Sequence, residues 1–140
     1  MLADTGTVRG MIVFGVEGLP EIGIGADLAA MIHAAVSVID GDIVVVTSKV
    51  VSKSEGTVID LADVTASAFA TRWAEQWGKD PRLIEVVLAE SRRIVRQANG
   101  VLITETHHGF VCANGGVDQS SSGAQERVVV LPQDLSLIHI

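Results

Sequence analysis

The chain has 140 residues, of which 48% are hydrophobic and 19% charged, which is the composition of a folded domain with its own core and not of a disordered segment. A formal net charge of −7 argues against a protein whose main task is to grip the nucleic-acid backbone, because that affinity depends on clustered Lys and Arg. With Cys112 as the one cysteine there is no intrachain disulfide, and no segment approaches the roughly 18 uninterrupted apolar residues of a membrane-spanning helix. We therefore expect a soluble, unexported, cytoplasmic protein that binds neither nucleic acid nor membrane.

The first third of the chain predicts a strand, a turn, a helix and a second strand. Residues 11–14 are a short apolar run closed by glycine, which suits a strand better than a helix. Residues 18–21, Gly-Leu-Pro-Glu, turn the chain, and from Asp27, a suitable N-cap, apolar residues recur at helical spacing as far as Val36. Residues 43–46 are a continuous β-branched run of the kind found in strands buried on both faces.

The remainder predicts two amphipathic helices and several short strands. The first helix covers about residues 66–77 and places three aromatic side chains on one face, where core or subunit packing is the expected role. The second begins at Asp80, a cap followed by proline, and is expected to continue until Gly100. The aromatics are Phe69, Trp73 and Trp77, and the expected strands are 58–59, 101–104, 110–113 and 128–131. This order of elements predicts an α+β fold (mixed α/β), with a mixed, partly antiparallel sheet covered by helices.

The end of the chain needs a separate explanation. Residues 135–140, Leu-Ser-Leu-Ile-His-Ile, are the translation of CTG TCT CTT ATA CAC ATC, the end sequence of a transposase that is used to prepare sequencing libraries. We therefore expect residues 1–134 to be the N-terminal portion of a longer domain and residues 135–140 to be an adapter-derived tail. The alternative is an ordinary apolar C-terminal strand.

A phosphate-binding composition follows the second predicted strand. Thr47, Ser48 and Lys49 bring hydroxyl donors, backbone N–H groups and a cation to the carboxyl edge of a sheet, where α/β proteins usually place ligands. Lys49 and Lys53 lie four residues apart, so a helical continuation would direct both toward a polyphosphate from one side. Taken alone, this pattern also fits two solvated lysines on a surface turn.

The Gly-rich segment 113–120 is a second candidate site. Its paired glycines let the backbone approach a ligand, and Asp118 is a hard oxygen ligand suited to a Mg²⁺ or Mn²⁺ ion that nucleotide phosphates also hold. A plain Gly-rich hairpin with a capping Asp is the alternative interpretation.

Two other patterns are weaker. The Gly23-Ile24-Gly25 turn superficially resembles a dinucleotide-binding fingerprint, but Leu28 stands where the third glycine is expected. His107 and His108 are adjacent, and adjacent residues on a strand point to opposite faces, so they are poorly placed to chelate one ion.

Three segments together resemble, in order and spacing, the coenzyme F420:L-glutamate (γ-glutamyl) ligases: residues 18–21, 42–56 and 109–118. The resemblance extends from about residue 13 to residue 134. It implies that GTP phosphorylates the terminal carboxylate of the deazaflavin precursor F420-0 and that the amine of L-glutamate attacks the acyl phosphate to form an amide. Lysines and divalent ions are needed because three anionic reactants have to be neutralised and positioned.

The resemblance also implies roles for individual residues. Asp118 is implied as a ligand of Mg²⁺ or Mn²⁺, with K⁺ as a further candidate cation, and no catalytic residue is assigned. The nucleotide contacts carry over to Leu19, Pro20, Glu21, Ile22, Ser48, Lys53 and Ser121. Ser121 stands where the family has Asn, so we expect that contact to be altered.

The family's second half supplies an Asp-Thr metal-binding step that this chain lacks. We therefore expect the chain alone to be inactive in ligation, and a homodimer for the full-length protein. Two alternatives remain from the residues themselves: a nucleotide-dependent oxidoreductase built on the Gly23–Gly25 turn, and a non-catalytic α/β binding module.

Overall fold

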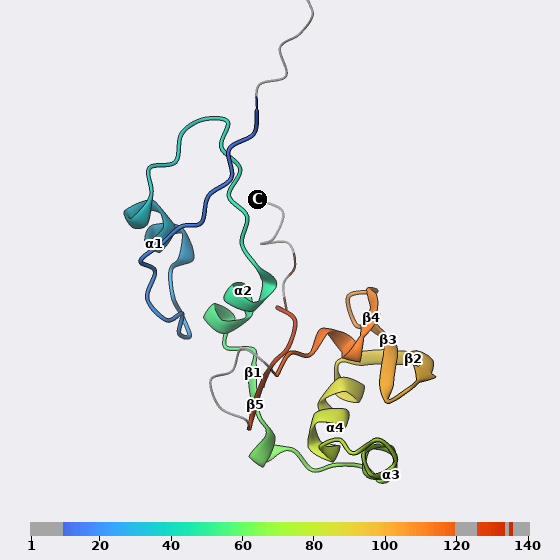
Figure 1. The fold of residues 1–140 in the computed structure, drawn as a ribbon. Coiled ribbons are helices and arrows are strands. Elements are labelled where there is room, and N and C mark those ends of the chain that lie inside the picture. Colours follow the sequence, from blue (N-terminus) through green and yellow to red (C-terminus); the bar gives the residue numbers. More distant parts are fainter. Residues whose placement is uncertain (1–9, 120–125, 134, 136–140) are drawn as a thin grey trace, which may run out of the picture.

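The computed structural model describes residues 10–119, 126–133 and 135, and in them four α-helices accompany two small antiparallel sheets (Figure 1). The helices are α1 (Leu28–Ala35), α2 (Ser48–Glu55), α3 (Ala68–Trp77) and α4 (Pro81–Ala89), with short 3₁₀ helices η1 (Leu61–Asp63) and η2 (Asn114–Gly116). The strands are β1 (Val58–Asp60), β2 (Ser91–Ala98), β3 (Val101–Thr106), β4 (Val111–Ala113) and β5 (Arg127–Val129). The predicted α+β class is confirmed. Of the expected adapter-derived tail, residues 136–140 lie outside the described residues.

The strands pair as β1–β5 in one sheet and β2–β3–β4 in the other. The second predicted helix is too long: α4 ends at Ala89, and residues 91–98 form β2, which runs antiparallel to β3. The turn between these strands is Asn99-Gly100, and both residues have positive φ, 49° and 74°. An Asn-Gly pair with this geometry is a strong hairpin signal, which explains why the chain reverses as two strands instead of extending the helix.

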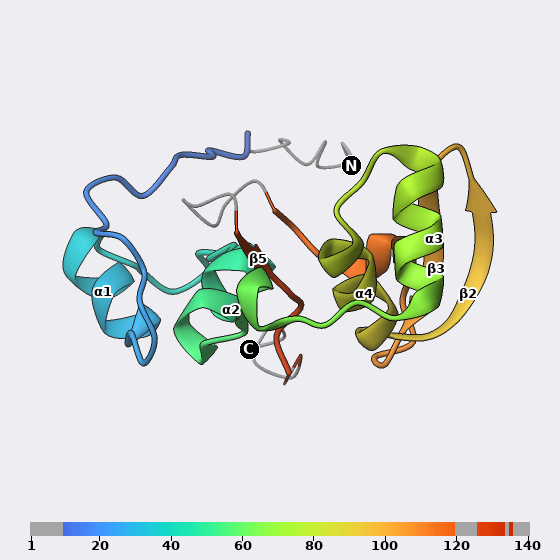
Figure 2. The ribbon, with the colours of Figure 1, turned by 90° about the horizontal axis from the view of Figure 1, so that it is seen from below.

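Two hydrophobic clusters form the core, and α4 contributes to both. Ile84 and Val87 of α4 pack against α3 and β3, while Val86 packs against η1 and β5. The first cluster consists of Ala70, Trp73, Ala74, Ile84, Val87 and Leu102, and the second of Leu61, Val86, Val128 and Val130. Seen from below, α3, α4 and the three-stranded sheet lie on one side, α1 lies on the other, and α2 with β5 lies between them (Figure 2).

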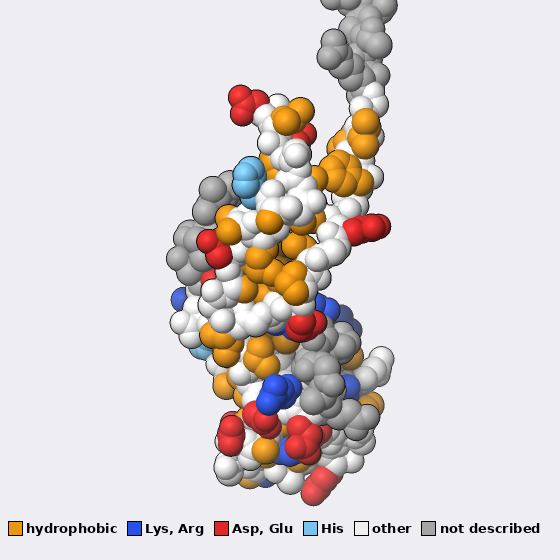
Figure 3. Space-filling model, turned by 90° about the vertical axis from the view of Figure 1, so that its left-hand side faces the viewer, with side chains coloured by type: hydrophobic (Ala, Val, Ile, Leu, Met, Phe, Trp, Pro, Cys, Tyr) orange, Lys and Arg blue, Asp and Glu red, His pale blue; other side chains and the backbone are white. Residues whose placement is uncertain are grey.

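The segment before α2 contributes no buried residue to this core, since every residue from 10 to 50 is half-buried or exposed. The prediction of strands at residues 11–14 and 43–46 is therefore wrong, because both segments are irregular in the structure. A strand needs a neighbour for its backbone N–H and C=O groups, and within the described residues neither segment has one. Their apolar side chains are left exposed, and hydrophobic atoms gather on the upper part of one face (Figure 3).

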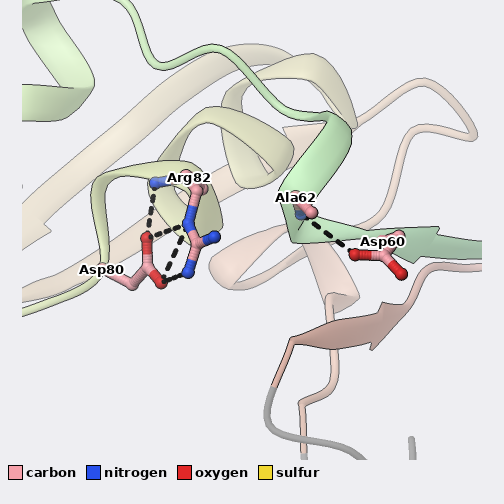
Figure 4. A network of polar contacts seen from close by, with 4 residues as sticks. All are labelled: Asp60, Ala62, Asp80 and Arg82. Atoms are coloured by element: carbon pink, nitrogen blue, oxygen red, sulfur yellow. Dashed lines mark hydrogen bonds and ion pairs between the residues drawn. The ribbon is translucent and has the colours of Figure 1, made fainter.

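Side-chain caps mark where α1, α3 and α4 begin. The predicted N-caps Asp27 and Asp80 are confirmed, because the Asp27 carboxylate accepts from Ala30 N at 3.0 Å and the Asp80 carboxylate accepts from Arg82 N at 2.8 Å. Asp80 also receives the Arg82 guanidinium, with Nη2 at 2.8 Å from Oδ2 (Figure 4). This side-chain hydrogen bond lowers the pKa of Asp80 below its ordinary value and outweighs the effect of partial burial.

Candidate functional site

Helix α2 carries the predicted phosphate-binding lysines. It begins after Thr47, whose side chain makes no capping hydrogen bond, and it ends at Gly56, which has φ 78°. The first N–H groups of a helix lack intrahelical partners and carry the positive end of the dipole, so this end can receive an anion. Val51 and Ser52 are buried and hold the helix in place, which leaves its N-terminal turn at the surface.

The Gly-Leu-Pro-Glu turn lies against the C-terminal half of α2. Lys53 Nζ donates to Glu21 Oε1 at 2.6 Å, and the Gly25 N–H donates to the Ser54 carbonyl at 2.8 Å. Ile24 packs on Gly56, where an added Cβ would lie 3.4 Å from the Ile24 side chain. The Gly23–Gly25 turn therefore docks the N-terminal segment on α2.

The other lysine of α2 contacts the second candidate site, since Lys49 forms an ion pair with Asp118. Asp118 is fixed by its backbone: its N–H donates to the Val129 carbonyl at 2.9 Å, and the Val129 N–H donates back at 2.8 Å. Gly116, two residues earlier, has φ 72° and lies so close to Leu131 that an added Cβ would be 3.0 Å from that side chain. The paired glycines thus let the segment turn tightly and bring Asp118 to α2.

The structure places the predicted site residues on three segments that meet at α2. Leu19, Pro20 and Ile22 flank Glu21 on the turn before α1, Ser48 is the first residue of α2, and Lys53 lies in its last turn. Two ion pairs, Lys53–Glu21 and Lys49–Asp118, join these segments. Ser121, the remaining predicted nucleotide contact, lies outside the described residues.

Lys49 is paired with a residue that the sequence did not predict, because its expected partner was a polyphosphate. Its four-residue spacing from Lys53 predicts that both share one side of a helix, and α2 confirms the helix. No pattern near Lys49 in the sequence predicts its pairing with Asp118. The pair forms because a segment almost 70 residues further along the chain packs beside α2.

Asp118 is the described residue best suited to hold a divalent metal. No group of three or more His, Cys, Asp or Glu residues that could hold an ion occurs in the part of the chain that the structure describes. A Mg²⁺ site needs only one or two carboxylates when nucleotide phosphates supply further oxygens. Asp118 forms an ion pair with the Lys49 ammonium, so a cation can approach its carboxylate. A hollow of about 330 Å³ beside it is lined by Lys79, Leu83, Asn114 and Gln119, among others.

The weaker sequence signals have structural explanations. Nε2 of His107 lies 2.8 Å from the Ala89 carbonyl and that of His108 lies 3.3 Å from the Gln133 carbonyl, so the two rings serve different partners. The three aromatics of α3 follow one another along one face: Phe69 stacks on Trp73 with ring centroids 6.3 Å apart, and Trp77 is tilted by 45° against Trp73 at 6.0 Å. Trp73 belongs to the core. Cys112 is half-buried, and desolvation raises the pKa of its thiol. Among the described helices, none is long and apolar enough to cross a membrane.

Comparison with known proteins gives a consistent result. Residues 18–138 match the family model described as F420-0:gamma-glutamyl ligase. The chain is 44% identical over 117 residues to the coenzyme F420:L-glutamate ligase of Methanothermobacter thermautotrophicus, covering 80% of this chain and 46% of the relative. It is 48% identical over 117 residues to that of Halorubrum lacusprofundi, covering 79% and 46%. The chain thus spans about half the length of the relatives that it matches.

Proposed function

Because the chain belongs to the F420-0:gamma-glutamyl ligase family, we propose that it forms the nucleotide-binding part of a GTP-dependent ligase that joins L-glutamate to F420-0. One observation carries the proposal: two ion pairs bring the Gly-Leu-Pro-Glu turn and Asp118 to the same helix, α2. Three segments that resemble the family's nucleotide site in sequence therefore also converge in space.

The proposed reaction begins at this helix. The GTP phosphates would lie at the N-terminus of α2, with the Ser48 hydroxyl donating a hydrogen bond and the Lys53 ammonium neutralising charge. An oxygen of the F420-0 carboxylate attacks the γ-phosphorus and GDP leaves. The glutamate amine then attacks the acyl carbon, phosphate leaves, and the new amide nitrogen loses a proton. Asp118 would hold Mg²⁺ or Mn²⁺, which supplies neutralisation of the phosphate charge.

The structure gives less support to the two alternative functions, an oxidoreductase and a non-catalytic binding module. The Gly23–Gly25 turn, on which a dinucleotide-dependent oxidoreductase would rest, has a packing role: the Gly25 N–H binds the Ser54 carbonyl, and Ile24 covers Gly56. A non-catalytic binding module would share the fold but not the reaction. The homodimer, the cytoplasmic location and the K⁺ ion stay predictions.

The test compares the chain alone with a chimera in which residues 1–134 are followed by the C-terminal portion of the Methanothermobacter relative. Each is incubated with F420-0, L-glutamate, GTP and MnCl₂, and glutamylated product and GDP are measured by mass spectrometry. We expect product from the chimera only, and only with GTP and metal present. A folded chimera that binds GTP without forming product would favour the binding module.

A matched pair of variants connects the reaction to α2. Lys53→Met in the chimera should lower kcat/KM at least about tenfold, the loss expected for a charge that contacts phosphate. Arg72→Met, which removes one positive charge from α3, should leave it nearly unchanged. Equal losses in both variants would mean that only the overall charge matters and would contradict the assignment of Lys53.

A further inference from the structure

We propose that the open face of the β2–β3–β4 sheet binds a flat aromatic anion, with Arg92, Arg93 and Arg96 as its cationic side. Under the proposed function, on which this inference rests, the occupant is F420-0. Its deazaflavin ring lies on the sheet, and its carboxylate end extends toward Asp118. The GTP phosphates are assigned to α2, so this surface gives the second substrate a site of its own.

One face of this sheet is packed and the other is open. Leu102, Thr104 and Thr106 of β3 are buried, and Leu102 belongs to the core cluster that α3 and α4 form on that side of the sheet (Figure 2). Ile103 points to the other side, because side chains alternate along a strand. No described helix packs on that open face, and Val111 of β4 is 57% exposed there.

An irregularity in β2 brings two arginines to the open face. In a regular strand Arg93 and Arg96 would point to opposite faces, because they are three residues apart. The register shifts between them, with Val95 as the extra residue, so that Arg93 stands opposite Glu105 and Arg96 stands opposite Ile103. Bulges of this kind re-aim side chains and are frequent beside functional sites. The common direction of the two arginines therefore indicates a ligand on this face.

The open face is positive, although the chain has a net charge of −7. Arg92 is the extra residue of a second register shift and lies beside Arg93. Arg92 and Arg96 are exposed and form no ion pair within the described residues. Arg93 pairs with Glu105, the one acid among the paired residues of this face, with Nε 2.8 Å from Oε2. The surplus positive charge favours an anionic occupant and disfavours a second copy of the same face.

The surface between the arginines and β4 is apolar. Ile103 lies between Arg96 on β2 and Ala113 on β4, and the other apolar side chains of this face include Val101 and Val111. A guanidinium group stacks on aromatic rings as well as pairing with anions. An aromatic anion therefore uses both parts of the surface, whereas an inorganic ion would use the arginines alone.

The surface also leads toward the proposed nucleotide site. β4 ends at Ala113, and η2 carries the chain on to Asp118, five residues later. Asp118 in turn contacts Lys49 of α2. A long substrate on the sheet can thus extend along β4 and bring the carboxylate that the proposed reaction phosphorylates toward α2.

The experiment titrates F420-0 with the 140-residue chain and follows the fluorescence anisotropy of the deazaflavin. The chain alone should bind F420-0, because every proposed contact lies within it, and excess GTP should not displace it. In Arg96→Gln we expect the dissociation constant to rise about threefold or more, and in the double variant Arg92→Gln/Arg96→Gln about tenfold. Arg72→Gln is the matched control: it removes the same charge from an exposed arginine of α3 and should keep the dissociation constant within about twofold.

Three results would overturn the inference: no binding of F420-0 to the chain, displacement of F420-0 by GTP, or equal losses in Arg96→Gln and Arg72→Gln. Failure of the proposed function looks different. A chain that binds F420-0 through Arg96 but does not bind GTP contradicts the nucleotide site and supports the sheet surface.

A further measurement addresses the other known use of arginines on an outer strand, which is to prevent sheets from pairing edge to edge. If that were their role, the double variant would associate in size-exclusion chromatography and bind F420-0 as tightly as the unaltered chain, which would overturn the inference. Arg96→Lys, with circular dichroism as the folding check, guards against a variant that fails to fold. It keeps the charge but not the planar guanidinium, so it should weaken F420-0 binding less than Arg96→Gln does.

Discussion

Nζ of Lys53 lies 2.6 Å from Oε1 of Glu21, 32 residues earlier in the chain. The two side chains differ in exposure, with 21% of Lys53 and 84% of Glu21 open to solvent. The carboxylate therefore covers a sheltered ammonium from the solvent side. In the proposed nucleotide complex a phosphate would have to compete with Glu21 for Lys53, so we predict that Glu21 modulates nucleotide affinity.

Glu21→Gln should raise the affinity for GTP by up to about fivefold, because an exposed ion pair contributes roughly 0.2–1 kcal/mol and the substitution removes the competing negative charge. Isothermal calorimetry with the chimera at low and high salt measures this. The gain should shrink at high salt, where exposed charges are screened. A weaker affinity in Glu21→Gln would mean that the carboxylate itself contacts the nucleotide or metal.

The sequence singles out the residues of the candidate site, while their contacts could not be predicted. Residue type and spacing make Lys53 and Asp118 candidates for a phosphate contact and a metal ligand, the resemblance adds the turn at 18–21, and these roles stay predictions. The Lys53–Glu21 and Lys49–Asp118 pairs join segments 32 and 69 residues apart. No local pattern encodes such pairs, because they follow from how α2 packs against the rest of the chain.

Gly116→Ala should destabilise the chain by about 2 kcal/mol or more and weaken Mn²⁺ binding. The new Cβ would face both a φ of 72° and the Leu131 side chain at 3.0 Å, and Asp118 is two residues away. Gly109→Ala is the control: its φ is 88°, but nothing lies within 4 Å of the added Cβ. It should cost only the conformational strain of about 1–2 kcal/mol and leave Mn²⁺ binding unchanged. Urea unfolding and EPR titration measure both effects; equal costs would contradict the close packing at Leu131.

Asp80 gives a pH-dependent prediction. Its pKa is lowered by Arg82, so its contribution to stability is fully present above the ordinary carboxyl pKa of 3.8 and is lost as pH falls through the lowered value. Asp80→Ala, which removes cap and ion pair, should cost about 1 kcal/mol at pH 7 and less at pH 3. Urea unfolding at the two pH values measures the difference. Glu75→Gln on α3 should change stability by less than about 0.5 kcal/mol at either pH; a similar loss in both variants would point to net charge instead of the cap.

The sequence predicted the helices better than the sheets. Asp27 and Asp80 mark helix starts because a cap is a local interaction, and both are confirmed. β2 was missed because Ile94 and Val95 fit a helical spacing as well as a strand, although Asn99-Gly100 was the hairpin signal that would have decided it. Residues 43–46 have strand composition without a strand partner in the described residues, and composition alone does not supply the partner.

Residues 43–46 are exposed in a chain that spans about half the length of the relatives that it matches. Val45 is 87% exposed, although β-branched runs of this kind normally form strands buried on both faces. We expect the remaining half to supply the neighbouring strand and cover. Val45→Lys should then change the free energy of unfolding of the chain alone by less than about 0.5 kcal/mol, and destabilise the chimera by about 2 kcal/mol or more, the value of a buried valine. Val95→Lys, on the outer strand β2 and 42% exposed, should have a small effect in both.

Hydrogen exchange gives the direct measurement: amides 43–46 should be protected only in the chimera. Protection in the chain alone that grows with protein concentration would instead assign the cover to a second copy.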